Sequence, residues 1–429
     1  MNRLKKITKS KERKSLVENL SYLSLLQLAN YVFPLITLPY LSRTIGVYGF
    51  GKLAFAGAVM LWFRTVVDWG FNFTATKEVV RVRDDARKIS VIFSDVLWAK
   101  ILLLSVSFLV LIILIFTIPL FRENALVLAL SFLLLPGHIA FPEWFFQAME
   151  KMKYITILNV LSKLVFTIAV FVVIRHESDY YFQPLLSALG YLIAGMIAFF
   201  LIVKRWNVRI VKPNIKRVLE MLKSGTSVFI NTIIPNIFSS LSVVLLGFWG
   251  GVKSTGLFDA GNKFITIGHQ VTNILSRTFF PVLARKIDKH GMYTHICLSV
   301  ALVISVLLFL FAPLLINVFF TEEFIGAVIV LRIKAFCVFF VALNRVYGVG
   351  YLLLKNRERM MQNVTTICSV IGFVIMLPLV WFFDYIGAAL AILISQALIG
   401  IVMMIKSKII QNEENKTANQ SCRSICNER

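Results

Sequence analysis

Acidic residues are scarce in this chain. Its 429 residues include 22 Asp and Glu against 45 Lys and Arg, and charged residues of both signs make up 16% of the total. Soluble domains carry about 25% charged residues, so the composition argues against a water-soluble globular fold. The formal net charge of +23 does not indicate nucleic-acid binding, because the basic residues are spread over many short segments and not gathered on one domain.

Motifs of covalent chemistry are also missing. There is no GxxxxGK[ST] phosphate loop; the nearest segment, Gly256–Lys263, has Asn262 where that loop needs Lys. No HExxH or GxSxG motif occurs, and the five cysteines form no CxxC spacing, which predicts free thiols. We therefore predict no catalytic residue, metal or cofactor, and we expect transport that this chain does not drive with ATP.

The chain is rich in apolar residues. They make up 58% of it, the mean hydropathy is +0.80, and the apolar runs are long enough to cross a bilayer. This predicts an all-α polytopic membrane protein of about 12 transmembrane helices. The basic start, Met1–Lys14, leads into a run too long for a cleaved signal peptide, so the first span is expected to remain as an anchor. The predicted spans are 18–43, 50–71, 90–118, 124–148, 154–175, 183–204, 224–250, 255–279, 294–320, 324–353, 361–383 and 386–407.

Lys and Arg crowd into every second gap between these runs. Basic clusters occupy the N-terminus and the segments 77–88, 204–223 and 355–359, whereas the intervening gaps carry almost none. Because cytoplasmic loops are enriched in Lys and Arg, both termini are predicted to be cytoplasmic.

The basic segment 204–223 divides the chain into two halves that resemble each other. Gly46-Val47, after the first span, recurs as Gly251-Val252 after the seventh span. Six spans per half give a parallel repeat, which places a substrate path between the halves. The predicted organisation is a six-helix bundle at 1–203, a cytoplasmic linker at 204–223, a second six-helix bundle at 224–410 and a polar cytoplasmic tail at 411–429.

Charged residues also occur inside the apolar runs, where exposure to lipid costs roughly 2.5–3.5 kcal/mol or more. Such charges must face the bundle interior or a water-filled cavity. Cations outnumber acids among them, which predicts a cationic cleft and an anionic substrate, for which phosphate or diphosphate is the natural match. The predicted substrate-binding cations are Arg64, Lys100, Lys163, Lys263, Arg332 and Lys334.

Two acids have basic partners four residues away on the same helix face. These pairs are Arg64 with Asp68 and Asp259 with Lys263. Each pair either neutralises itself or couples transport to an ion, so Asp68 and Asp259 are candidates for ion coupling.

A second group of residues lies near the expected cytoplasmic ends of the spans. We interpret Asp95, Glu143, Arg277 and Arg345 as side chains that reach the headgroups. The aromatic run Trp144-Phe145-Phe146 is interpreted in the same way, as part of an interfacial aromatic belt.

Three segments of the first half resemble a known family. Pro34–Gly46, Asp68–Thr76 and Pro142–Met152 are similar to the O-antigen flippases of the Wzx group. These belong to the polysaccharide transporter branch of the multidrug/oligosaccharidyl-lipid/polysaccharide (MOP) exporter superfamily. In the second half the resemblance lies mainly in layout, with looser matches at Gly256–Lys263 and Asn344–Gly348.

The resemblance implies a V-shaped fold of two six-helix bundles in a bacterial inner membrane. It implies that undecaprenyl-diphosphate-linked oligosaccharide repeat units cross to the periplasmic leaflet, coupled to an ion gradient. The polysaccharide polymerase and chain-length regulator of the pathway are the expected protein partners. The alternative is a multidrug or cation antiporter of the same superfamily, against which the excess of buried cations argues. A polymerase or ligase would need a larger periplasmic loop, and a glycosyltransferase scaffold would leave the intramembrane charges without a purpose.

Overall fold

The structure is a computed structural model that describes residues 2–285 and 289–427, and these residues are almost entirely helical. Contacts divide the chain into two compact units, Met1–Val244 and Leu245–Arg429. The elements in chain order are α1 (Asn2–Asp68), α2 (Phe71–Arg81), α3 (Ala86–Thr117), α4 (Pro119–Glu123), α5 (Ala125–Phe132), α6 (Leu134–Ala140), α7 (Glu143–Ala148), α8 (Met152–Val173), η1 (Glu177–Tyr181), α9 (Phe182–Trp206), α10 (Ile215–Trp249), α11 (Gly251–Arg285), α12 (His290–Leu310), α13 (Ala312–Phe319), η3 (Glu322–Phe324), α14 (Ala327–Leu343), η4 (Asn344–Leu352) and α15 (Glu358–Asn427).

The helices fit the expected polytopic fold. Within the described residues, eight helical stretches are long and apolar enough to cross a membrane. Two of these stretches, Ser21–Arg81 and Glu358–Glu414, are 61 and 57 residues long. One transmembrane helix needs about 20 residues, so each stretch is long enough to cross the membrane twice. Each contains a break in helical geometry, at Gly46 in α1 and at Asp384 in α15, so each supplies two crossings. The long helices α10 and α11 complete the set of about 12.

The repeated glycines predicted from the sequence both sit at chain reversals. Gly46 has φ 60° and Gly251 has φ 77°, positive values that glycine adopts readily and residues with a Cβ rarely adopt. Each glycine follows the first long helical segment of its half. Each half of the sequence therefore has a glycine with positive φ after its first long helical segment.

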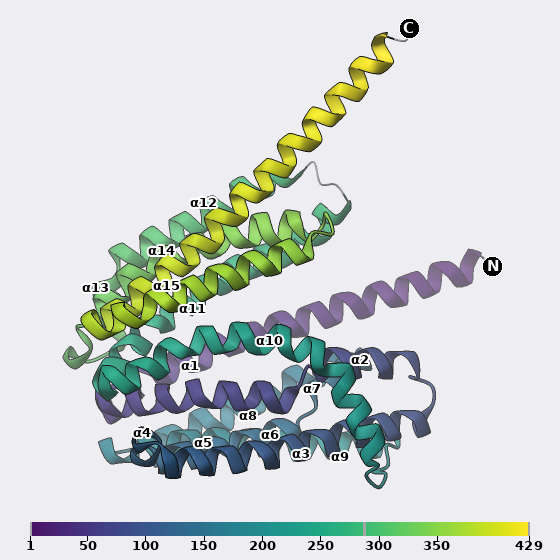
Figure 1. The fold of residues 1–429 in the computed structure, drawn as a ribbon. Helices are drawn as coiled ribbons and strands as arrows, with labels where there is room; N and C mark the ends of the chain where they lie inside the picture. The colour runs from purple at the N-terminus through teal and green to yellow at the C-terminus, as the bar shows by residue number, and fades with distance from the viewer. Residues whose placement is uncertain (1, 286–288, 428–429) are drawn as a thin grey trace. The chain divides into compact units, whose positions relative to one another are not determined.

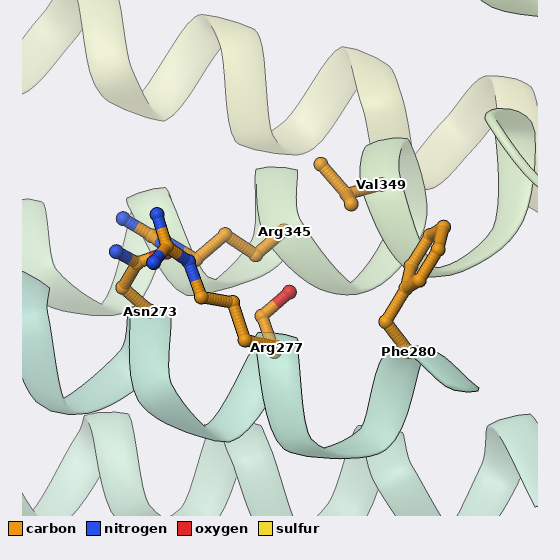
Figure 2. Close-up of a pocket in the computed structure, with 6 residues that line it drawn as sticks. Asn273, Arg277, Phe280, Arg345 and Val349 are labelled. Atoms are coloured by element: carbon orange, nitrogen blue, oxygen red, sulfur yellow. The ribbon is translucent and has the colours of Figure 1, made fainter. Parts of the chain in front are cut away.

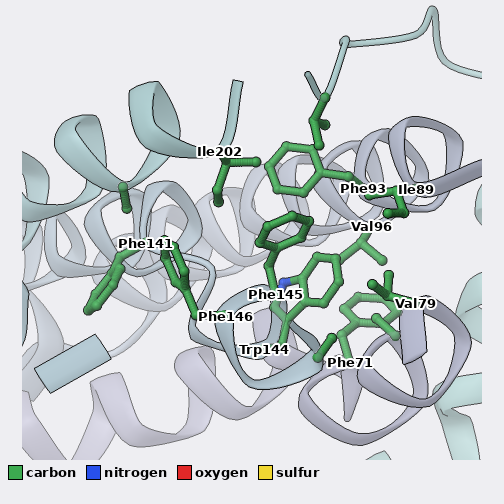
Figure 3. Close-up of a cluster of buried hydrophobic side chains, with 14 of the residues drawn as sticks. Phe71, Val79, Ile89, Phe93, Val96, Phe141, Trp144, Phe145, Phe146 and Ile202 are labelled. Carbon is green, nitrogen blue, oxygen red and sulfur yellow. The ribbon is translucent and has the colours of Figure 1, made fainter. Parts of the chain in front are cut away.

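In the first unit, α8 packs against α1 and α9, and α9 also packs against α6 (Figure 1). Trp144, Phe145 and Phe146 of the short helix α7 lie in the core of this unit, at 2%, 0% and 0% exposure. Figure 3 shows them among Phe71, Phe93 and Ile202. The interpretation as an interfacial belt was wrong, because α7 lasts only six residues and turns its aromatic side chains inward beneath α2 and α3.

The basic segment 204–223 is held against the first unit. Trp98 donates a hydrogen bond to the Val211 carbonyl at 3.0 Å, and Arg217 Nε donates to both carboxylate oxygens of Asp95 at 3.2 and 2.9 Å. Further along, Phe229 stacks on Trp69 with ring centroids 3.9 Å apart. These contacts lie within the first compact unit, which ends at Val244. Asp95 is thus the buried partner of Arg217 and not a headgroup anchor.

In the second unit, α14 is the central helix and contacts α11, α12 and α15. It continues without interruption into η4, a π-helical segment. Such segments are rare and are frequently found at functional sites. The predicted tail 411–429 continues α15 as far as Asn427.

Candidate functional site

The buried charges of the first unit centre on Asp68, at the end of α1. Its carboxylate accepts a hydrogen bond from Lys100 Nζ of α3 at 2.8 Å, and Arg64 Nε lies 3.8 Å from the other oxygen. Lys100 is 4% exposed, whereas half of the Arg64 side chain is exposed. A lysine this deeply buried requires its counter-ion. Asp68 therefore holds one buried cation and one accessible cation at a single carboxylate.

A second polar group in this unit joins α7 to α8. Asn159 donates a hydrogen bond to Glu143 Oε1 at 2.9 Å, and Lys163 stands one turn further along α8, half-buried. His138 of α6 packs on Tyr191 of α9 with ring centroids 4.3 Å apart. Glu143 is therefore engaged inside the unit and is not the headgroup-reaching side chain that we expected.

In the second unit, α11 carries most of the polar side chains. Lys263 Nζ and Asp259 Oδ2 are 2.7 Å apart, which confirms this pair of the sequence analysis. From α14, Lys334 donates a hydrogen bond to Asn262 Oδ1 at 2.6 Å and is 4% exposed. Arg332 is exposed and lies 5.5 Å from the Phe309 ring. Arg332 and Lys334 thus occupy different faces of α14, as their spacing predicts.

Two hydrogen bonds of the same kind connect α11 to the α14–η4 helix. Lys334 bonds to Asn262, and Arg345 Nη1 bonds to Asn273 Oδ1 at 2.6 Å. Both pairs are separated by 72 residues in the sequence. The two helices are therefore in register over about three turns. Each bond fixes a basic side chain against an amide oxygen.

These amides are the residues that sequence reasoning missed. Polar side chains recur on one face of α11 at steps of three or four residues, which is the spacing of neighbours on a helix. The stripe consists of Asp259, Asn262, Lys263, Thr266, Gln270, Asn273 and Arg277. A count of helical spacing in the sequence would have found it. The charged residues alone did not reveal the stripe, because the uncharged amide side chains fill the positions between them.

Arg277 and Arg345, which the sequence places at different points of the chain, lie together in the structure. Both line one pocket of the second unit, together with Asn273, Ser276, Phe280 and Val349 (Figure 2). Their interpretation as side chains that reach the headgroups stays a prediction. The register between α11 and η4 brings them together.

The arrangement can attract and orient an anion. Among the described residues, no three His, Cys, Asp or Glu side chains gather as metal ligands would. Long apolar helices that enclose cations and amides are typical of a transporter, in which intramembrane charges mark the path of a substrate or ion. The fold and the site thus define a multi-pass membrane transporter.

The chain belongs to the Polysaccharide biosynthesis protein family, which matches residues 16–287. It is 29% identical over 398 residues to an Escherichia coli (strain K12) protein described as "Putative O-antigen transporter", covering 91% of this chain and 96% of that protein. A Shigella dysenteriae protein with the same description is 23% identical over 394 residues, with 90% and 98% covered.

Solved structures of the same fold come from the MOP superfamily. An inward-facing MATE-family multidrug resistance transporter aligns with a TM-score of 0.69 at 14% identity, over 93% of this chain and 99% of that one. The lipid II flippase MurJ in an inward closed conformation aligns with the same TM-score and identity, over 90% and 87%. The expected MOP fold is confirmed. At this identity the likeness concerns the fold and does not choose between drug and lipid substrates.

Proposed function

We propose that this protein is a flippase that moves undecaprenyl-diphosphate-linked oligosaccharide repeat units across the bacterial inner membrane. The observation that carries the proposal is the match along nearly the whole chain to two proteins described as O-antigen transporters. Membership of the polysaccharide biosynthesis family supports it. The product would feed lipopolysaccharide or another surface polysaccharide.

The cations at membrane depth fit such a substrate. A diphosphate carries negative charge that Arg and Lys bind through charge-assisted hydrogen bonds. Arg64, Lys163, Lys263 and Arg332 are exposed or half-buried, so they are our candidates for contact with the substrate. Lys100 and Lys334 are buried and hydrogen-bonded. Their geometry favours a positioning role.

The energy source is part of the proposal. The chain contains no phosphate loop, so we propose alternating access driven by an ion gradient. Asp68 and Asp259 are the candidate coupling carboxylates, since each sits beside a cation whose attraction depends on the charge of the acid. We further propose that both termini are cytoplasmic and that the pathway's polymerase and chain-length regulator are partners.

Analysis of lipid-linked intermediates tests this function. Deletion of the gene should cause a single diphosphate-linked repeat unit to accumulate on the cytoplasmic leaflet and should deplete surface polysaccharide. A plasmid with the wild-type gene should reverse both effects. Normal surface polysaccharide with no accumulated intermediate would contradict the proposal. Efflux of ethidium that depends on this chain would instead support the multidrug antiporter.

A further inference from the structure

We infer that the pocket between α11 and η4 is a binding site for a phosphoryl anion, with Arg277 and Arg345 as its ligands. The pocket measures about 280 Å³ and belongs entirely to the second unit. The identification of this anion as the diphosphate of the transported lipid rests on the proposed function. The prediction that the pocket binds a phosphoryl anion rests only on the residues that line it.

The residues that line this pocket lie on one face of α11 and on one face of η4. On α11, Asn273, Ser276, Arg277 and Phe280 follow the spacing of neighbours on a helix. On η4, Arg345 and Val349 are also four residues apart. Figure 2 shows the two guanidinium groups together beside Asn273, with Phe280 and Val349 at the opposite side of the pocket. One side is therefore cationic and polar, and the other is apolar.

The two cations have no acid to balance them. None of the six lining residues is acidic, and in the described part of the chain neither arginine forms a salt bridge. Arg345 Nη1 donates to Asn273, but its Nε is buried without a hydrogen-bond partner. A buried donor without an acceptor is costly, and two neighbouring positive charges repel. An anion with several oxygens would relieve both costs.

The chemistry favours a phosphoryl group in particular. Guanidinium groups present a planar fork of N–H donors that matches phosphate oxygens, and two of them can hold one group from two directions. The Asn273 amide and the Ser276 hydroxyl add donors beside them. Sites for drug-sized ligands occupy roughly 300–1,000 Å³. This pocket therefore fits a headgroup-sized anion and leaves the oligosaccharide outside.

Two molecules could supply this group: the diphosphate of a polyprenyl-linked substrate and the headgroup of a bilayer phospholipid. The shared chemistry is a lipid-borne phosphoryl anion. The apolar side chains Phe280 and Val349 on the opposite side of the pocket suit a ligand whose next group is hydrocarbon.

The test measures binding of inorganic pyrophosphate to the purified full-length chain in non-ionic detergent, by its effect on the unfolding temperature. The wild type should be stabilised in a saturable way. The double variant R277Q/R345Q should bind at least roughly tenfold more weakly, since hydrogen bonds to charged groups are worth about tenfold each or more. Arg285→Gln is the matched control, because Arg285 is an exposed arginine at the end of the same helix and does not line the pocket.

A second variant keeps both arginines and guards against a folding defect. Asn273→Asp is nearly isosteric and places a carboxylate beside the Arg345 guanidinium. This carboxylate should pair with Arg345 and so compete with a bound anion. We expect weakened pyrophosphate binding with an unchanged or raised unfolding temperature in the absence of ligand. Wild-type affinity in both R277Q/R345Q and Asn273→Asp would overturn the inference.

Competition identifies the source of the anion. If farnesyl diphosphate displaces pyrophosphate at lower concentrations than phosphatidylglycerol does, the pocket serves a polyprenyl diphosphate. The reverse order assigns it to a phospholipid headgroup, and either order supports a phosphoryl site. The two proposals can be rejected separately. Unchanged pyrophosphate binding in the variants would reject the binding site, even if the deletion strain accumulates the lipid-linked intermediate. Absence of that accumulation would reject the flippase function, even if the pocket binds pyrophosphate.

Discussion

Lys100 forms a buried ion pair with Asp68 in the first unit. Its side chain is 5% exposed, and its ammonium group lies 2.8 Å from Asp68 Oδ1. Removing one partner of a buried ion pair leaves the other charge uncompensated, which typically costs about 3–5 kcal/mol, whereas neutralising both partners costs far less. The pair can therefore be tested for structure and for function separately.

We predict that Asp68→Asn lowers the stability of the purified protein by about 3 kcal/mol, because Lys100 loses its counter-ion. The double variant D68N/K100M should recover most of that stability. If the pair serves only to hold α1 against α3, the double variant also recovers transport. Our account expects stability to recover and transport to remain low. Thermal unfolding and surface-polysaccharide levels in the same strains measure the two effects.

Residues also show where sequence reasoning succeeds and where it ends. Pairs within one helix, such as Asp259 with Lys263, follow from spacing alone and are present in the structure. The pairing of Lys100 with Asp68 joins residues 32 apart on different helices. Arg345 and Asn273 are 72 apart. Such contacts depend on which helix faces meet, and hydropathy carries no information about that.

At the scale of elements, the helices themselves were largely predictable. Membrane-length apolar runs fix their approximate positions, and the repeated Gly46 and Gly251 mark the turns. The short helix α7 was not predictable in the same way. It breaks away after Pro142 and buries Trp144, which hydropathy cannot distinguish from an interfacial aromatic residue.

The turn at Gly251 gives a prediction of its own. A Cβ at this position would meet nothing within 4 Å, so a substitution is opposed by backbone conformation and not by crowding. We expect Gly251→Val to destabilise the protein by roughly 1–2 kcal/mol. Gly251→Asn should cost much less, because asparagine tolerates the left-handed region. Equal losses in thermal unfolding for the two variants would contradict this explanation.

The start of α3 gives a pH-dependent prediction. Asp85 caps this helix, and hydrogen bonds from the backbone N–H groups of Lys88 and Arg87 lower the pKa of its carboxyl from the ordinary 3.8. A lowered pKa in the folded state stabilises the protein above the ordinary value, and this contribution is lost as the pH falls through the folded value. The protection of the amides in the first turn of α3 against exchange, corrected for the intrinsic rate at each pH, should therefore fall at acid pH in the wild type. In Asp85→Asn that acid-dependent change should be absent.

At the scale of the whole molecule, this chain combines membership of a polysaccharide biosynthesis family, a MOP fold and a set of buried cations. Family membership rests on residues 16–287, and the MOP fold on alignments that cover at least 90% of the chain. Composition already predicted a polytopic transporter without covalent chemistry. The sugars of a substrate could not be predicted from composition, because residues that contact sugars in proteins are ordinary polar and aromatic side chains.

We propose that this chain moves a lipid-linked oligosaccharide and attracts its diphosphate with membrane-embedded cations. The most direct measurement reconstitutes the full-length protein in vesicles with a fluorescent undecaprenyl-diphosphate oligosaccharide and follows its protection from a quencher that cannot cross the membrane. We predict ion-gradient-dependent transfer that R64Q/K163Q slows by roughly tenfold or more, since each charged hydrogen bond contributes about 1.5–3 kcal/mol. Absence of transfer by the wild type, or wild-type rates in the double variant, would contradict the account.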